Sequence, residues 1–229
     1  MKISHNVYVV PGVTANSYIL ADADGLTIID TGLPFSEKRI LNYVARLGKS
    51  ARNVRRILIT HADLDHYGCL AALKRASGAC AYASRLEAAA MAAGRSSRPV
   101  ERSIDTALQR FLIAMMSRLM KATAIQVDEI LAEGQILPVL GGLQVVETPG
   151  HSPDHLSYFV PSAGLLFCGD SMRSDGKRGF RGSRSRNDWD SALASVSVRK
   201  QAELDAQIVC PGHGPVVRDA SGKFPVSAA

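Results

Sequence analysis

The sequence has few cysteines, little aromatic content and no long apolar run. Its longest apolar stretch, at 111–120, contains Arg118 and is shorter than the roughly 20 apolar residues that cross a bilayer. The N-terminus, MKISHNVYVVPG, lacks the apolar core of an export signal. The cysteines show no CxxC spacing, so they indicate small buried residues in a reducing compartment rather than disulfides. These absences argue against a membrane protein and predict a cytoplasmic location. The four cysteines are Cys69, Cys80, Cys168 and Cys210.

Length and hydrophobicity are sufficient for one compact domain. The chain has 229 residues, of which 46% are hydrophobic, and it contains no low-complexity linker. We therefore expect a single domain over 1–229. The formal net charge of +6 permits anionic partners but does not identify one.

Strand and helix patterns alternate in both halves of the chain. Segments 7–10, 17–20 and 26–30 are short strand-like runs separated by turn residues, which predicts an antiparallel meander. Helical spacing follows around Ile40, Val44 and Leu47, and again after Gly68 and Ser84. The second half, from QILPVL at 135–140 to QIVCPGHG, repeats this alternation of strand and helix patterns. The pattern predicts an α/β sandwich with helices covering two packed sheets.

A long helical pattern at about 95–127 is inserted between the two halves of the chain. Its apolar face, which includes Met115 and Met116, would suit an adaptable lid over an acyl chain. It would equally suit a helix pair packed on the core or on a second copy in a homodimer. The sequence leaves both readings open.

Five of the six histidines fall in three short segments. Each segment follows an apolar, strand-like run, and an aspartate in LLFCGDSM is delivered in the same way. Imidazole nitrogen and carboxylate oxygen are ligands for Zn²⁺, Fe and Mn²⁺, and loops on a rigid scaffold can bring them together. The pattern therefore predicts a metal site. The residues concerned are His61, Asp63, Asp65 and His66 in THADLDH, His151 and His155 in TPGHSPDH, Asp170, and His213 in CPGHG.

The ordered combination resembles the metallo-β-lactamase superfamily, which typically shows HxHxDH, a histidine after glycine, an aspartate in GD and a histidine in GHG. The resemblance implies a four-layer αββα sandwich and two divalent metal ions, usually zinc. His61, Asp63 and His151 would bind the first metal. Asp65, His66 and His213 would bind the second, and Asp170 would bridge the two.

Asp63 stands where the family most often has histidine. A carboxylate is a harder, charged ligand, which favours Fe or Mn relative to an all-imidazole site. Two divalent ions, three carboxylates and a bridging hydroxide sum to zero charge, so the bound water should be less acidic than with histidine at 63. The alternative is that Asp63 is not a ligand.

The neighbours of these ligands suggest supporting roles. We interpret His155 as orienting a ligand or closing the site, or else as an ordinary hydrogen-bonded loop residue. Asp154 would cap the next strand or hold His155, and Cys69 and Cys168 read as core. The basic segment after Asp170 offers Arg178 and Arg181 for an anionic substrate, unless it is simply a solvated loop.

The resemblance implies a hydrolase in which a metal-bridging hydroxide cleaves an ester, lactone or thioester of a small molecule. Asp65 would be the catalytic residue that steers the proton of the nucleophile. Only 16 residues follow His213 (229 − 213), so we do not expect the glutathione-binding domain that follows the core in glyoxalase II-like enzymes. The alternatives are a β-lactam hydrolase and a di-iron oxidoreductase related to flavodiiron proteins. The low aromatic content of 6% argues against nucleic acid as a partner.

Overall fold

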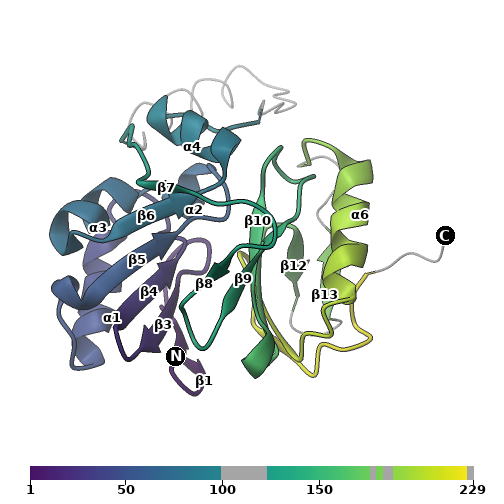
Figure 1. Ribbon diagram of the computed structural model, residues 1–229, viewed down its shortest axis with the longest axis horizontal. Helices are drawn as coiled ribbons and strands as arrows, with labels where there is room; N and C mark the ends of the chain where they lie inside the picture. The colour runs from purple at the N-terminus through teal and green to yellow at the C-terminus, as the bar shows by residue number, and fades with distance from the viewer. Residues whose placement is uncertain (99–122, 176–178, 183–187, 226–229) are drawn as a thin grey trace, which may run out of the picture.

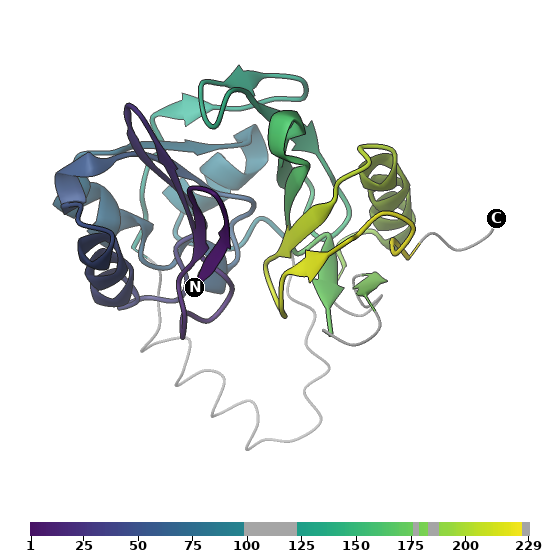
Figure 2. The same ribbon diagram turned by 90° about the horizontal axis from the view of Figure 1, so that it is seen from below.

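Two β-sheets pack face to face, with helices on both outer faces (Figure 1). The computed structural model describes residues 1–98, 123–175, 179–182 and 188–225. Seen from below in Figure 2, the first helices and the last helix lie on opposite sides of the two sheets. This arrangement confirms the predicted αββα sandwich. None of the helices in these ranges is long and apolar enough to cross a bilayer.

The first sheet has seven strands in sequence order. β1 to β4 pair antiparallel, as the meander predicted, whereas β4, β5, β6 and β7 run parallel. The parallel strands need crossover helices, and the chain supplies them between β4 and β6. The strands are β1 (Lys2–Ser4), β2 (Val7–Val9), β3 (Tyr18–Asp22), β4 (Gly25–Ile29), β5 (Val54–Leu58), β6 (Cys80–Ala83) and β7 (Glu129–Ile130).

The described residues of this half form four helices, and three of them pack on the outer face of the first sheet. The predicted periodicity of the first is confirmed, because Ile40 and Val44 are buried against the sheet. Gly78 ends α3 in the left-handed conformation that glycine adopts without strain. The helices are α1 (Glu37–Arg46), the one-turn α2 (Leu64–Tyr67), α3 (Leu70–Ser77) and α4 (Arg85–Ala92), with a 3₁₀ turn η1 (Ala51–Asn53) before β5.

The second sheet has six strands in the order β15-β14-β11-β10-β9-β8. Only β11 and β14 are parallel, and α6 connects them across the outer face. Asp190 caps α6 by accepting the N–H groups of Ala192 and Leu193. The elements are β8 (Ile136–Leu137), β9 (Leu143–Glu147), β10 (Leu156–Val160), η2 (Pro161–Ala163), β11 (Leu165–Gly169), the separate hairpin β12 (Met172–Ser174) and β13 (Phe180–Gly182), α6 (Ser191–Ala202), β14 (Ile208–Pro211) and β15 (Val217–Arg218).

The core has three parts that match the four layers. One cluster lies between the helices and the first sheet, one between the sheets, and one under α6. Tyr158 and Phe167 are fully buried in the middle cluster, and each large side chain buried there contributes about 1.5–3 kcal/mol. The sheets are therefore held rigidly, which fixes the positions of the loops at their ends.

Three local expectations differ from the structure or lie outside it. The predicted strand 135–140 reduces to β8, because Pro138 cannot donate to a ladder and Leu140 is left-handed. Asp65 and His66 lie on the single turn α2 instead of a loop. The helical insertion predicted at about 95–127 falls mainly on 99–122, outside the described residues, and the flanks 95–98 and 123–127 are not helical.

Candidate metal centre

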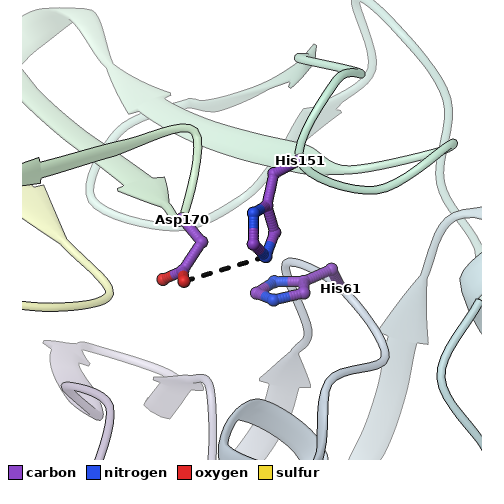
Figure 3. Close-up of side chains that lie close together, drawn as sticks. All are labelled: His61, His151 and Asp170. Atoms are coloured by element: carbon purple, nitrogen blue, oxygen red, sulfur yellow. Dashed lines mark ion pairs between the residues drawn. The ribbon is translucent and has the colours of Figure 1, made fainter. Parts of the chain in front are cut away.

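The predicted site segments meet at one edge of the two sheets. THADLDH follows β5, GD closes β11 and GHG follows β14, while His151 lies in the β9–β10 connection. Since β4 runs parallel to β5 and β11 parallel to β14, their carboxyl ends lie at the same edge. Figure 3 shows His61, His151 and Asp170 directed toward one another from three separate segments.

The first group of candidate ligands is His61, His151 and Asp170, whose ligand atoms lie within 4.8 Å of one another. His151 Nε2 is 3.8 Å from Asp170 Oδ2 (Figure 3). Asp63 approaches the same imidazoles, with Oδ2 at 3.6 Å from His61 Nε2 and 3.5 Å from His151 Nε2. The three residues proposed for the first metal are thus brought together, with Asp170 beside them.

The second group is Asp65, His66 and His213. His213 Nε2 lies 3.3 Å from Asp65 Oδ2. Asp170 reaches this group as well, with Oδ1 at 3.3 Å from His66 Nε2 and Oδ2 at 3.4 Å from His213 Nε2. Asp170 therefore faces both groups, which is the geometry a bridging ligand needs.

The donor set fits a pair of divalent cations. The Nε2 atoms of His61 and His66 and Oδ1 of Asp170 are buried and make no hydrogen bond to any residue that the structure describes. Leaving buried polar atoms unsatisfied is costly, so their convergence indicates a missing partner. Neutral imidazole and carboxylate together are ligands of Zn²⁺, Fe and Mn²⁺.

A buried network behind the ligands sets the orientation of two imidazoles. Asp30 Oδ2 lies 2.8 Å from His66 Nδ1 and accepts the Thr60 hydroxyl at 2.8 Å. The Thr60 oxygen is 3.0 Å from His61 Nδ1 and can accept its proton. These bonds place each ring proton on Nδ1, so each Nε2 lone pair faces the site. Sequence reasoning missed Asp30, although it follows β4 as the other candidates follow their strands.

His155 is buried and holds the backbone of Asp170. Its Nε2 accepts the Asp170 N–H at 3.2 Å, and its Nδ1 lies 2.8 Å from the Thr148 hydroxyl. Burial, followed by the nearby His61 and His151, lowers the pKa of His155 well below its usual value, so the ring is neutral. A Cβ at Gly169 would collide with this ring. The contact fits the predicted role of orienting a ligand.

Glu87 links the two loops that carry the first group. It is fully buried at the start of α4, and Oε2 accepts the N–H of Ala62 at 2.7 Å, while Oε1 accepts the hydroxyl of Ser152 at 2.7 Å. Ala62 lies between two candidate ligands, and Ser152 follows His151. Asp154 caps α4 through the N–H of Leu86, which is neither of the two roles expected for it. No sequence pattern separated Glu87 from ordinary helix residues.

Glu87→Gln should weaken metal binding at the first group by roughly 10–100-fold, the usual cost of losing a partner that orients ligands. The amide fits the same space, but its NH₂ group must face donors that the carboxylate now satisfies. Titration of metal-free protein with Zn²⁺ measures this. Ser152→Ala removes one of the contacts and should have a smaller effect. Unchanged affinity in Glu87→Gln would show that α4 does not position the site.

Asp63 has two partners that the sequence did not suggest. Ser96 donates its hydroxyl to Oδ1 at 2.7 Å, and Arg98 Nη2 donates to Oδ2 at 2.5 Å. Burial would raise the pKa of Asp63, but His151, His61 and Arg98 hold it well below its usual range. The charge count made from sequence omitted Arg98. Its positive charge lies against Asp63 and would offset that carboxylate, while the expectation of a less acidic water stays a prediction.

Two further charged groups border the site. Arg173 Nη2 contacts Asp170 Oδ2 at 2.6 Å, which confirms that part of the basic segment reaches the site. Asp188 Oδ1 lies 3.5 Å from His151 Nδ1 and its side chain is buried. Arg178 and the side chain of Arg181 lie outside the described residues, so their proposed contact with substrate stays a prediction.

The carboxylates and imidazoles shift one another's protonation. Burial would raise the pKa of Asp170, but facing His66, His151 and His213 lowers it well below its usual range. Burial would lower the pKa of His66, but Asp170 and Asp30 raise it well above its usual value. The carboxylates thus remain charged and favour the protonated form of His66. A divalent cation at the same point would be attracted more strongly than this proton.

The cysteines take no part in this cluster. Cys69, Cys168 and Cys210 are buried, which confirms the reading of Cys69 and Cys168 as core residues. Burial raises the pKa of Cys69 to about 12, so its thiol stays protonated, and that thiol donates to the carbonyl of Thr31.

The chain is an αββα sandwich in which histidines and aspartates cluster at the ends of strands. This arrangement is that of a class of metal-binding enzymes. The model of the metallo-beta-lactamase superfamily matches residues 10–213. The chain therefore belongs to this metallo-hydrolase superfamily.

Relatives are distant but span most of the chain. A probable metallo-hydrolase of Bacillus subtilis, YflN, is 24% identical over 216 residues, covering 87% of this chain and 80% of the relative. Hydroxyacylglutathione hydrolase GloC of Haemophilus influenzae is 25% identical over 214 residues, covering 91% of each. The structure of a Cronobacter sakazakii metallo-beta-lactamase with the motif HARLDQ matches at a TM-score of 0.71 and 25% identity, covering 93% of this chain and 77% of that one.

Proposed function

We propose that this protein is a metal-dependent hydrolase that cleaves an ester, lactone or thioester bond of a small molecule. Two divalent ions would be held by His61, Asp63 and His151 on one side and by Asp65, His66 and His213 on the other, and zinc is the usual metal of the family. Asp170 would be a ligand shared by both ions. Fe or Mn remain alternatives, because Asp63 adds a hard oxygen ligand.

The observation that carries this proposal is the position of Asp170 between the two groups of candidate ligands. Its two oxygens face His66 at 3.3 Å, His213 at 3.4 Å and His151 at 3.8 Å. A pair of metal ions held there would supply a water activated for attack and a positive charge that polarises the acyl oxygen. Superfamily membership agrees with hydrolysis but leaves the bond type open.

The exposure of the ligands indicates the side from which substrate approaches. The side chains of Asp65 and His213 are 30% and 25% exposed, whereas His61, His66, His151 and Asp170 are buried. The substrate would therefore meet the Asp65 and His213 side of the centre.

Asp65 is suited to handle the proton of the attacking water. Burial would raise the pKa of Asp65, but its contact with His213 lowers it to about 2, so the carboxylate is charged at neutral pH. As the water oxygen bonds to the acyl carbon, Asp65 Oδ2 accepts its proton and releases it to the departing oxygen or sulfur. The acyl–oxygen or acyl–sulfur bond then breaks, giving an acid and an alcohol or thiol.

The hydroxyacylglutathione hydrolase relative favours a thioester among the three bond types. An anionic substrate suits the site as well, because Arg98 and Arg173 add positive charge beside the ligands. A second candidate function is β-lactam hydrolysis, because the similar Cronobacter sakazakii structure is that of a metallo-beta-lactamase. Both reactions attack an acyl carbon, so the substrate panel must separate them.

Removal of metal should abolish hydrolysis. We expect about two metal ions per chain by elemental analysis. We also expect activity on one class in a panel of thioesters, lactones, β-lactams and phosphodiesters. Dialysis against a chelator should reduce the rate by at least about 1000-fold, and Zn²⁺, Mn²⁺ or Fe²⁺ should restore it.

His5→Ala provides the matched control, because His5 is exposed and is the one histidine outside the cluster. It should keep the metal content and the rate of the unsubstituted chain. Full hydrolysis by metal-free protein would disprove the proposal. Oxygen consumption by an iron-loaded sample without hydrolysis would indicate the oxidoreductase alternative instead.

A further inference from the structure

Asp63 is the site residue that departs from the family pattern, and the structure gives it a partner. Its Oδ2 faces His61 Nε2 at 3.6 Å and His151 Nε2 at 3.5 Å, and the same oxygen accepts Arg98 Nη2 at 2.5 Å. The side chains of Arg98 and Asp63 are only 14% and 15% exposed. The pair is therefore shielded from solvent, and one carboxylate oxygen serves both the arginine and the candidate metal position.

Asp63 and Arg98 together carry no net charge, so the pair is equivalent in charge to one neutral ligand. A carboxylate at 63 adds one negative charge to the first group, and the guanidinium of Arg98 removes it. Histidine, the residue usual at this position, would be neutral by itself. In a partly buried site the charge of Arg98 remains weakly screened, so it also repels a divalent cation placed between His61 and His151.

Ser96 gives Asp63 a contact that does not involve the guanidinium of Arg98. Its hydroxyl donates to Oδ1 at 2.7 Å, on the carboxylate oxygen that Arg98 does not contact. Removing the guanidinium would therefore change the charge at Oδ2 more than it changes the position of the carboxylate. This separation allows the electrostatic effect of Arg98 to be measured.

We propose that Arg98 neutralises Asp63, so that this ligand behaves as an uncharged one and the first metal position binds its ion more weakly than an unpaired carboxylate at 63 would allow. The second position, formed by Asp65, His66 and His213, has no contact with Arg98 in the described part of the chain. The two positions would then differ in affinity. The inference rests on the proposed metal pair.

The test is the affinity of metal-free protein for Zn²⁺ at each position, measured by competition with a chromophoric chelator. Arg98→Gln should bind its ion at the first position at least about tenfold more tightly, while binding at the second position changes by less than about threefold. Arg98→Lys keeps the charge and should stay near the unsubstituted protein. Arg95→Gln removes the same charge from an exposed residue of the same segment and should change neither affinity.

A charge-exchange cycle gives the sharper result. Asp63→His with Arg98 retained leaves an uncompensated cation and should weaken the first position at least about tenfold. The double variant Asp63→His with Arg98→Gln restores the original charge and should return within about threefold of the unsubstituted affinity. Thermal unfolding of each metal-free variant checks that the fold is kept.

Two results would overturn the inference. One is an affinity of Arg98→Gln equal to or weaker than that of the unsubstituted protein. The other is a double variant that binds no better than Asp63→His alone. Failure of the proposed function has a different signature, because the unsubstituted chain would then bind no pair of metal ions at all.

Discussion

Asp170→Asn should reduce the metal content from about two ions per chain to one or fewer and reduce hydrolysis by at least about 1000-fold. Among the described residues, Asp170 is the carboxylate that faces both ligand groups, with Oδ1 toward His66 at 3.3 Å and Oδ2 toward His151 at 3.8 Å. The amide is neutral and offers a single oxygen, so it cannot satisfy both directions. Loss of a residue that merely orients ligands already costs 10–100-fold, and a shared ligand should cost more.

Elemental analysis after gel filtration measures the metal, and the substrate identified from the panel measures the rate. Asp219→Asn is the matched control, because Asp219 is exposed and its left-handed backbone accepts asparagine. It should leave both quantities unchanged. If Asp170→Asn retained two ions and full activity, Asp170 would not be the bridging ligand.

Asp30→Asn should destabilise the protein by about 2–4 kcal/mol and weaken metal binding at the second group by roughly 10–100-fold. Asp30 is buried and its carboxylate accepts Thr60 N–H at 2.9 Å and faces His66 Nδ1 at 2.8 Å. An amide nitrogen placed opposite His66 Nδ1 would force the ring proton onto Nε2. That atom faces Asp170, and a protonated Nε2 cannot bind metal.

Asparagine tolerates the left-handed backbone at position 30, where φ is 56°, so the variant tests the carboxylate and not the turn. Chemical denaturation of metal-free protein measures the stability, and Zn²⁺ titration measures the affinity. Thr60→Ser keeps the hydroxyl that contacts Asp30 and His61 and should stay close to the unsubstituted protein. A variant Asp30→Asn with unchanged Zn²⁺ affinity would show that this network does not set the His66 tautomer.

The fold was predictable because its signals are local. The short strand-like runs around Val7, Tyr18 and Leu26, separated by turn residues, predicted the antiparallel meander, and the spacing of Ile40 and Val44 predicted α1. The candidate ligands were predictable for a related reason. Each follows a strand, and the ends of parallel strands in a packed sandwich meet at one edge.

The supporting residues were harder to predict because their roles depend on distant partners. Glu87 looks like any helix residue until Ala62 and Ser152 are seen to donate to it across 25 and 65 positions of sequence. The partners of Asp154 show the same limit, since it caps α4 instead of acting within its own loop. Such contacts follow from how the two sheets pack, which no short window of sequence contains.

Sequence alone predicted the alternation of strands and helices, the two-sheet architecture and the set of histidines and aspartates that could bind metal. Only the tertiary structure decided the electrostatics of that set. It placed Arg98 on Asp63 and Arg173 on Asp170, and it put Asp30 behind His66. The physical reason is that ligand identity is a local property of residue type, whereas the charge and tautomer at a buried site depend on every group that packing brings near it.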